Sequence, residues 1–73
     1  MTLQEAVFLV NKRSCNINLQ WFVCKWNDGY IIHSTTYMKR FPHTKYEYST
    51  GHLNVEWDVV YSKKEKRFKH IVR

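Results

Sequence analysis

The segment Leu19–Thr36, LQWFVCKWNDGYIIHSTT, decides the fold because it has the pattern of a β-hairpin. Leu19–Trp26 and Tyr30–Thr36 are rich in aromatic and branched residues, and Asn27–Gly29 between them is a common three-residue hairpin connection. That connection predicts one face made of three cross-strand pairs, namely Trp26 with Tyr30, Cys24 with Ile32, and Phe22 with Ser34. Because this face is the more apolar of the two, we expect it to pack against a helix.

A second hairpin is predicted near the C-terminus. The period-two alternation of a half-buried strand is found at Val55, Trp57, Val59 and Tyr61. Lys63–Lys66 then forms a four-residue loop, and Arg67–Val72 returns along the first strand. The resulting register pairs Tyr61 with Phe68 and Val59 with His70. Between the two hairpins, Pro42 interrupts any central strand, and Lys45–Tyr48 could form a short one.

An amphipathic helix is predicted at the N-terminus. Thr2 and Glu5 have the spacing of a capping box, in which each side chain accepts a hydrogen bond from the other residue's backbone N–H. The apolar stripe that follows has helical spacing and consists of Leu3, Ala6, Val7 and Val10. We therefore predict a single small α+β domain, residues 1–73, with one N-terminal helix packed on a curled antiparallel sheet of four or five strands. A small open β-barrel with a capping helix is the alternative, because consecutive hairpins can also close up.

The composition favours a soluble binding protein with an anionic partner. Twelve Lys and Arg against six Asp and Glu give a net charge of +6, a strong positive field for 73 residues. The longest apolar run, Ala6–Val10, is far shorter than the ~20 residues of a membrane-spanning helix. Two cysteines, Cys15 and Cys24, are too few for the disulfide framework of a small secreted domain. We expect a cytoplasmic protein with reduced thiols and no membrane association.

Two clusters of basic residues are candidate nucleic-acid contacts. They consist of Lys39, Arg40 and Lys45 in the middle of the chain and Lys63, Lys64, Lys66, Arg67 and Lys69 near its end. Aromatic residues lie among them, and this mixture suits phosphate neutralisation together with base stacking. We therefore predict a non-enzymatic module that acts on nucleic acid or a nucleoprotein complex. The alternative is a solvated edge whose lysines prevent strand-to-strand aggregation. Alternation along the last strand predicts that Arg67, Lys69 and Arg73 share its solvent face.

The aromatic residues support a second hypothesis, in which the chain binds a host protein, and the positive charge also favours an acidic protein surface as partner. Tyr, Trp and Arg dominate the hot spots of protein interfaces, and the candidates here are Phe41, Tyr46 and Tyr48. Because Tyr46 and Tyr48 are two residues apart, we expect them to share one face of a strand. Under this hypothesis the chain is an inhibitor or accessory factor of the kind that phages and other mobile elements encode. An exposed edge strand could also pair with its copy to form a homodimer.

No metal, cofactor or catalytic site is predicted. The histidines and cysteines lack the spacing of zinc ligands, and the six acidic residues are scattered rather than clustered as in a metal-dependent nuclease. Both glycines, Gly29 and Gly51, look like turn residues, so no oxyanion loop is visible.

One catalytic chemistry needs no metal, namely RNA cleavage in which His or Tyr moves the proton and Lys or Arg holds the phosphate. Residues of these types are His52, Tyr61, Arg67, Lys69 and His70. The stretch Gly51–Tyr61, GHLNVEWDVVY, followed by a basic strand, resembles the terminal hairpin of RelE-type ribonuclease toxins. This likeness, a fold-level analogy over about a quarter of the chain, implies a metal-free ribonuclease. The toxins carry a second N-terminal helix, for which this chain has no room.

Overall fold

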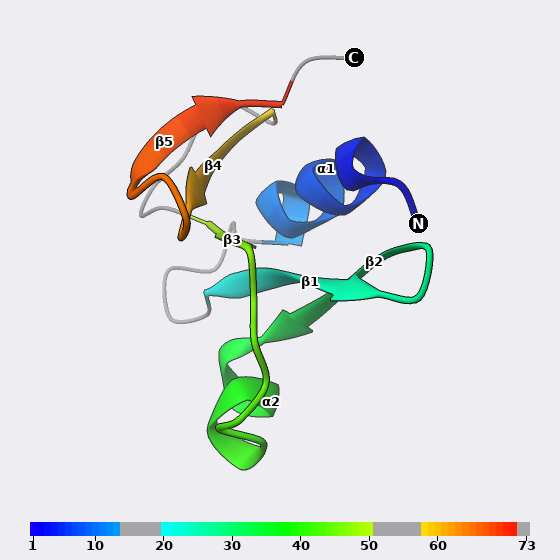
Figure 1. The fold of residues 1–73 in the computed structure, drawn as a ribbon, viewed down its shortest axis with the longest axis vertical. Coiled ribbons are helices and arrows are strands. Elements are labelled where there is room, and N and C mark those ends of the chain that lie inside the picture. The colour runs from blue at the N-terminus through cyan, green and yellow to red at the C-terminus, as the bar shows by residue number, and fades with distance from the viewer. Residues whose placement is uncertain (14–19, 51–57, 72–73) are drawn as a thin grey trace.

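The computed structural model describes residues 1–13, 20–50 and 58–71. The elements are α1 (Leu3–Arg13), β1 (Trp21–Trp26), β2 (Gly29–Ser34), α2 (Thr35–Arg40), β3 (Tyr48–Ser49), β4 (Val59–Ser62) and β5 (Arg67–His70). The strands make one antiparallel sheet in the order β2-β1-β3-β4-β5, so β2 and β5 are its edges (Figure 1). The predicted α+β class, with an N-terminal helix on an antiparallel sheet, is therefore confirmed, and the sheet is open rather than closed into a barrel.

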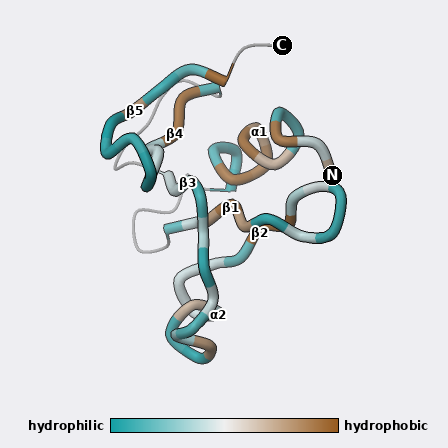
Figure 2. Tube along the Cα trace, viewed as in Figure 1, coloured by the Kyte–Doolittle hydropathy of each residue, from teal (hydrophilic) through white to brown (hydrophobic). Residues whose placement is uncertain are grey.

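The sheet curls around α1, which lies on its concave side (Figure 1). The core is small, because it consists of Ala6, Val7 and Val10 from α1 together with Val23 of β1 and Val60 of β4. Figure 2 shows hydrophobic colour in α1 and in parts of β1 and β4, whereas the loop between β4 and β5 is hydrophilic.

A buried polar side chain ties α1 to the sheet. The amide Nδ2 of Asn11 donates a hydrogen bond to the carbonyl of Val59 over 3.0 Å, so this helix is anchored to β4 by more than apolar contact. At the other end of α1 the predicted capping box is confirmed. The Glu5 N–H donates to Thr2 Oγ1 over 3.2 Å, and the Thr2 N–H donates to Glu5 Oε1 over 3.0 Å. In the described part of the chain, neither helix has the length and apolarity needed to span a bilayer.

The register of the first hairpin differs from the predicted one by one residue. The observed pairs include Val23 with Ile32 and Cys24 with Ile31. Val23 therefore faces α1. The predicted core face is confirmed for its β2 members Tyr30 and Ile32, which pack against the core, but it is wrong for its β1 members, which lie on the opposite side of the sheet: Phe22, Cys24 and Trp26. We call this side, turned away from α1, the outer face.

The physical reason is the turn, which has two residues rather than three. Asn27 adopts the left-handed φ of 49° that closes the turn, and Gly29 already belongs to β2. Gly29 is required for close approach, since a Cβ there would lie 2.7 Å from the carbonyl oxygen of Met1. That same oxygen accepts a hydrogen bond from the Tyr30 N–H over 2.9 Å.

The register of the second hairpin is confirmed. β4 and β5 pair Tyr61 with Phe68 and Val59 with His70, across the expected loop 63–66. The buried residue of β4 is Val60, however, whereas Val59 and Tyr61 are half-buried on the outer face. The predicted strand positions Val55 and Trp57 lie outside the described residues.

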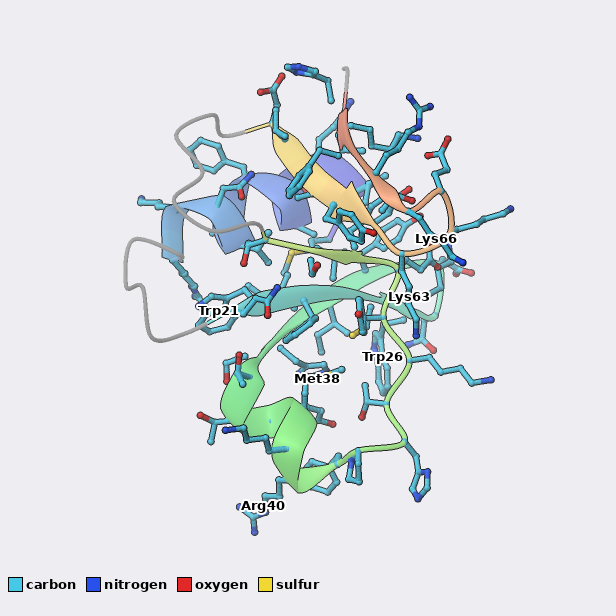
Figure 3. The ribbon with its side chains drawn as sticks, turned by 90° about the vertical axis from the view of Figure 1, so that its left-hand side faces the viewer. Trp21, Trp26, Met38, Arg40, Lys63 and Lys66 are labelled. Atoms are coloured by element: carbon cyan, nitrogen blue, oxygen red, sulfur yellow. The ribbon has the colours of Figure 1, made fainter. Side chains whose placement is uncertain are left out.

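A short second helix, α2, replaces the end of the strand predicted over Tyr30–Thr36. Ser34 caps it, because its hydroxyl accepts from the Tyr37 N–H. Thr35 still continues the β1–β2 ladder, because its N–H donates to the Gln20 carbonyl over 2.9 Å, and its hydroxyl both donates to that carbonyl and accepts from the Gln20 N–H. In Figures 1 and 3, α2 lies on the other side of the β1–β2 hairpin from α1.

Candidate nucleic-acid interface

A row of aromatic side chains crosses the outer face from one edge of the sheet to the other. Residues directly opposite each other in neighbouring strands share a face. The registers align His33 of β2, Phe22 of β1, Ser49 of β3, Tyr61 of β4 and Phe68 of β5. We call these five residues the outer row, and four of them carry rings. At its β5 end the Tyr61 and Phe68 ring centroids are 5.2 Å apart, and Phe68 is 54% exposed.

The helix α2 extends the outer row beyond β2. The Tyr37 ring stacks on His33 with centroids 3.7 Å apart and planes 7° apart. Phe41 follows four residues later, with its centroid 4.7 Å from that of Tyr37. The Phe41 ring is tilted by 39° from that of Tyr37 and is 48% exposed, so a stacked pair followed by a tilted ring runs from the sheet into solvent.

Tyr46 packs against the middle of the outer row. Its ring centroid lies 4.7 Å from that of Phe22, and the Lys63 ammonium lies 4.6 Å from the Tyr46 centroid, within the range of a cation–π contact. Tyr48, by contrast, packs against the core cluster beside α1. The prediction that Tyr46 and Tyr48 share a face is therefore wrong.

A β-bulge at the start of β3 separates these two tyrosines. The Thr50 N–H donates to the carbonyl of Trp21, and the Glu47 N–H donates to the carbonyl of Val23. Between these two hydrogen bonds the chain advances by three residues, from Glu47 to Thr50, but β1 advances by only two, from Val23 to Trp21. One extra residue on one strand of a pair defines a β-bulge. The extra residue reverses the alternation, so one tyrosine faces α1 and the other contacts Phe22.

The first basic cluster occupies the β4–β5 hairpin, and we call it the hairpin cluster. It consists of Lys63, Lys64, Lys66, Arg67 and Lys69, of which all but Lys69 are exposed. Glu65 lies among them, with Oε1 3.2 Å from Arg67 Nη2 and Oε2 2.7 Å from Lys69 Nζ. The hydrogen bonds from Lys69 and then Arg67 lower the pKa of Glu65, and the bond to Glu65 raises the pKa of Lys69.

Arg67 and Lys69 share one face of β5, as predicted, but it is not the outer face. The register pairs Lys69 with Val60, whose side chain is buried beside α1, so both cations lie on the concave side at the sheet edge. Arg67 has a side chain that is 68% exposed there, and Arg73 lies outside the described residues. The hairpin cluster therefore surrounds the edge of the sheet where the outer row ends at Phe68.

The second basic cluster, called the α2 cluster, consists of Lys39, Arg40 and Lys45, all exposed. The Arg40 guanidinium carbon lies 5.9 Å from the Phe41 ring centroid. A hollow of about 460 Å³ opens beside them, lined by Tyr37, Arg40, Phe41, Pro42, His43 and Thr44. Figure 3 shows Arg40 at the end of α2, well apart from Lys66 in the β4–β5 loop. Lys45 of this cluster precedes Tyr46, whose ring contacts Lys63 of the hairpin cluster.

Comparison with known proteins does not assign this chain to a family. No family model, no curated protein and no solved structure matches this chain. Its function is therefore inferred from the placement of its own side chains.

The residues expected for a metal-free ribonuclease are divided by the sheet. Tyr61 and His70 lie on the outer face, whereas Arg67 and Lys69 lie on the concave one. His52 lies outside the described residues. In the described strands, the groups that would move a proton are thus not placed with those that would hold a phosphate.

Titratable side chains also fail to gather into a metal site within the described ranges, where no three His, Cys, Asp or Glu residues come together. His70 Nδ1 lies 3.3 Å from Asp58 Oδ2 in an exposed pair. Cys24 is buried and not disulfide-bonded, and burial, followed by the charge of Glu47, raises the pKa of its thiol. Burial also lowers the pKa of His33, which favours its neutral form in the ring stack.

Sequence reasoning missed several of the exposed or stacked rings. The rings that it did not place among the interface candidates are His33, Tyr37, Tyr61, Phe68 and Trp26, the last being 59% exposed. A signal was present for two of them, because His33 and Tyr37 precede the predicted candidate Phe41 at successive intervals of four residues. That spacing places side chains on one side of a helix, but the helix itself was not predicted.

Proposed function

We propose that this chain is a non-enzymatic binding module for single-stranded nucleic acid. The observation that supports the proposal is the row of rings on the outer face, extended by Tyr37 and Phe41, with a basic cluster at each end. Such rings stack with unpaired bases, and the cations neutralise phosphates along the same strand. Stacking accepts every base, so we expect little sequence preference.

A double helix fits the described elements less well. Reading a major groove in the common motifs takes a helix or a β-ribbon that enters it. The apolar stripe of α1 is buried against the sheet, and α2 has only six residues. Rings on a sheet face, on the other hand, need bases that are already unstacked.

The proposal predicts strong salt dependence and a defined set of contacts. Neutralising the hairpin tip with Lys64→Gln, Lys66→Gln and Arg67→Gln should lower the slope of log K against log salt by about 2, because each lost phosphate contact on a single strand contributes about 0.7. Fluorescence anisotropy with a labelled dT12 or U12 oligonucleotide over a salt series measures this slope.

A matched control removes the same charge elsewhere. Lys12, Arg13 and Lys25 lie outside both basic clusters, so their combined change to Gln should leave the slope nearly unchanged. Equal losses in the two triple variants would show that only net charge matters. Absence of binding by the unmodified protein at low salt would contradict the proposed function.

A second candidate, binding to a protein, is favoured by one observation. Trp26 and Phe68 are 59% and 54% exposed, and large exposed rings are typical of interface hot spots. In that case Trp26→Ala should abolish capture of the partner, while salt should weaken the complex only modestly. An inhibitor or accessory role in the manner of mobile-element proteins would follow from the identity of that partner.

A further inference from the structure

The hollow beside α2 lies at the open end of the ring stack. His33 and Tyr37 are almost parallel, and Phe41 follows with its ring tilted by 39° and 48% exposed. The lining of the hollow combines apolar and polar groups, among them Pro42 and Thr44. A flat, π-electron-rich group that enters the hollow can therefore stack on Phe41 as the fourth member of the series.

Positive charge surrounds the same hollow. Arg40 and His43 line it, and Lys39 and Lys45, which flank this stretch of the chain, are exposed. Lys39 and Arg40 occupy the last turn of α2, where they offset the negative end of the helix dipole. No acidic side chain lines this hollow, whereas Glu47 and Glu65 both line the hollow near the β4–β5 hairpin.

We infer that this hollow is a nucleotide subsite, in which one unpaired base stacks on Phe41 and its phosphate binds Arg40. The inference rests on the proposed function and adds to it a site that holds one nucleotide of the strand by both its base and its phosphate. A ligand that joins an aromatic ring to an anion can contact the Phe41 ring and the Arg40 guanidinium at the same time. A neutral apolar ligand would leave the guanidinium of Arg40 without a partner, and inorganic phosphate alone would leave Phe41 exposed.

The test uses ligands too small to reach the hairpin cluster. Adenosine monophosphate and ribose 5-phosphate carry the same phosphate, but only the first has a base. Titrations followed by ¹H–¹⁵N correlation spectra should show the nucleotide binding roughly five- to a hundredfold more tightly, as expected for one stacked base. The shifted amides should lie within residues 37–44. Equal affinity for the two ligands, or shifts centred on residues 61–68, would overturn the subsite.

Two variants separate the base from the phosphate. Phe41→Leu should abolish the difference between the two ligands, whereas Arg40→Gln should weaken both by the same factor. Phe68→Leu, at the other end of the outer row, is the matched control and should leave the difference intact. Loss of the difference in Phe68→Leu but not in Phe41→Leu would overturn the assignment.

The oligonucleotide experiment distinguishes the two levels of failure. If dT12 binds with steep salt dependence while adenosine monophosphate binds no better than ribose 5-phosphate, the subsite is wrong and nucleic-acid binding stands. If neither dT12 nor the nucleotide binds, the proposed function fails and the subsite fails with it.

Discussion

The thiol of Cys24 makes the stability of the fold depend on pH. It is buried in β1, and burial together with the charge of Glu47 raises its pKa above that of an exposed cysteine. In the unfolded chain the thiol ionises near pH ~8.5. The unfolded state therefore loses this proton at a lower pH than the folded state, and stability that is present below the unfolded pKa is lost as pH rises toward the folded one.

This coupling gives a prediction for the free energy of unfolding. In a Cys15→Ser background, the unfolding free energy should fall between pH 8 and pH 9.5, with a slope of at most ~1.4 kcal/mol per pH unit from this group. Urea denaturation at several pH values measures it, with Cys24→Ala in the same background as the control. The variant is expected to be less stable at pH 7 but to show a flatter profile. Parallel profiles would contradict the burial of the thiol.

At the scale of elements, Glu65 restrains the hairpin cluster. Its carboxylate bridges Arg67 and Lys69, so a phosphate that approaches these cations must displace it. Glu65→Gln should therefore raise the affinity for dT12 a few-fold and steepen the salt slope by up to about 1. The thermal midpoint should hardly change, because exposed ion pairs contribute little to stability.

The control for this prediction is Asp28→Asn, which removes the same charge from the opposite hairpin. In Figure 1 the β1–β2 turn and the β4–β5 loop lie at opposite sides of the molecule. An equal gain in affinity from both variants would mean that Glu65 acts only through net charge.

The elements also show which structural features the sequence could predict. The register of the β4–β5 hairpin was predicted correctly because its loop of four polar residues fixes the pairing, although the apolar alternation named Val59 and Tyr61 where Val60 is the buried residue. The first hairpin shifted by one residue because Asn27 takes the left-handed conformation, which leaves a two-residue turn. A one-residue shift moves the side chains of one strand to the other face relative to its partner. Here Tyr30 and Ile32 of β2 still face the core, whereas Trp26 of β1 lies outside it.

The remaining differences arise from contacts that are distant in the sequence. The bulge that separates Tyr46 from Tyr48 depends on the hydrogen bond from Glu47 to Val23, 24 positions earlier in the chain. Likewise, α2 forms where Thr35 bonds Gln20, although branched residues favour a strand there. The basic residues were found because charge is read directly from composition. The aromatic row depends on registers across five strands and was not predicted.

At the scale of the whole molecule, the separation of the two basic clusters makes binding depend on ligand length. The chain measures about 30 Å along its longest axis. A stacked strand advances ~3.4 Å per nucleotide, so about nine nucleotides span that length. A dT12 strand can thus reach from Arg40 to Lys66, which Figure 3 shows well apart, whereas a dT3 strand is too short to do so.

Two sets of substitutions distinguish a bridging strand from separate sites. One removes the hairpin charges through Lys64→Gln, Lys66→Gln and Arg67→Gln, and the other removes the α2 charges through Lys39→Gln and Arg40→Gln. For dT12, each set alone should cost much of the affinity, and the combined loss should be close to the product of the two, because distant sites act additively in free energy. For dT3, either set alone should lower the apparent affinity by no more than about twofold, since the other end still binds. Titration calorimetry gives both affinities, and a dT12 complex that responds to only one set would mean that the strand does not cross the outer face.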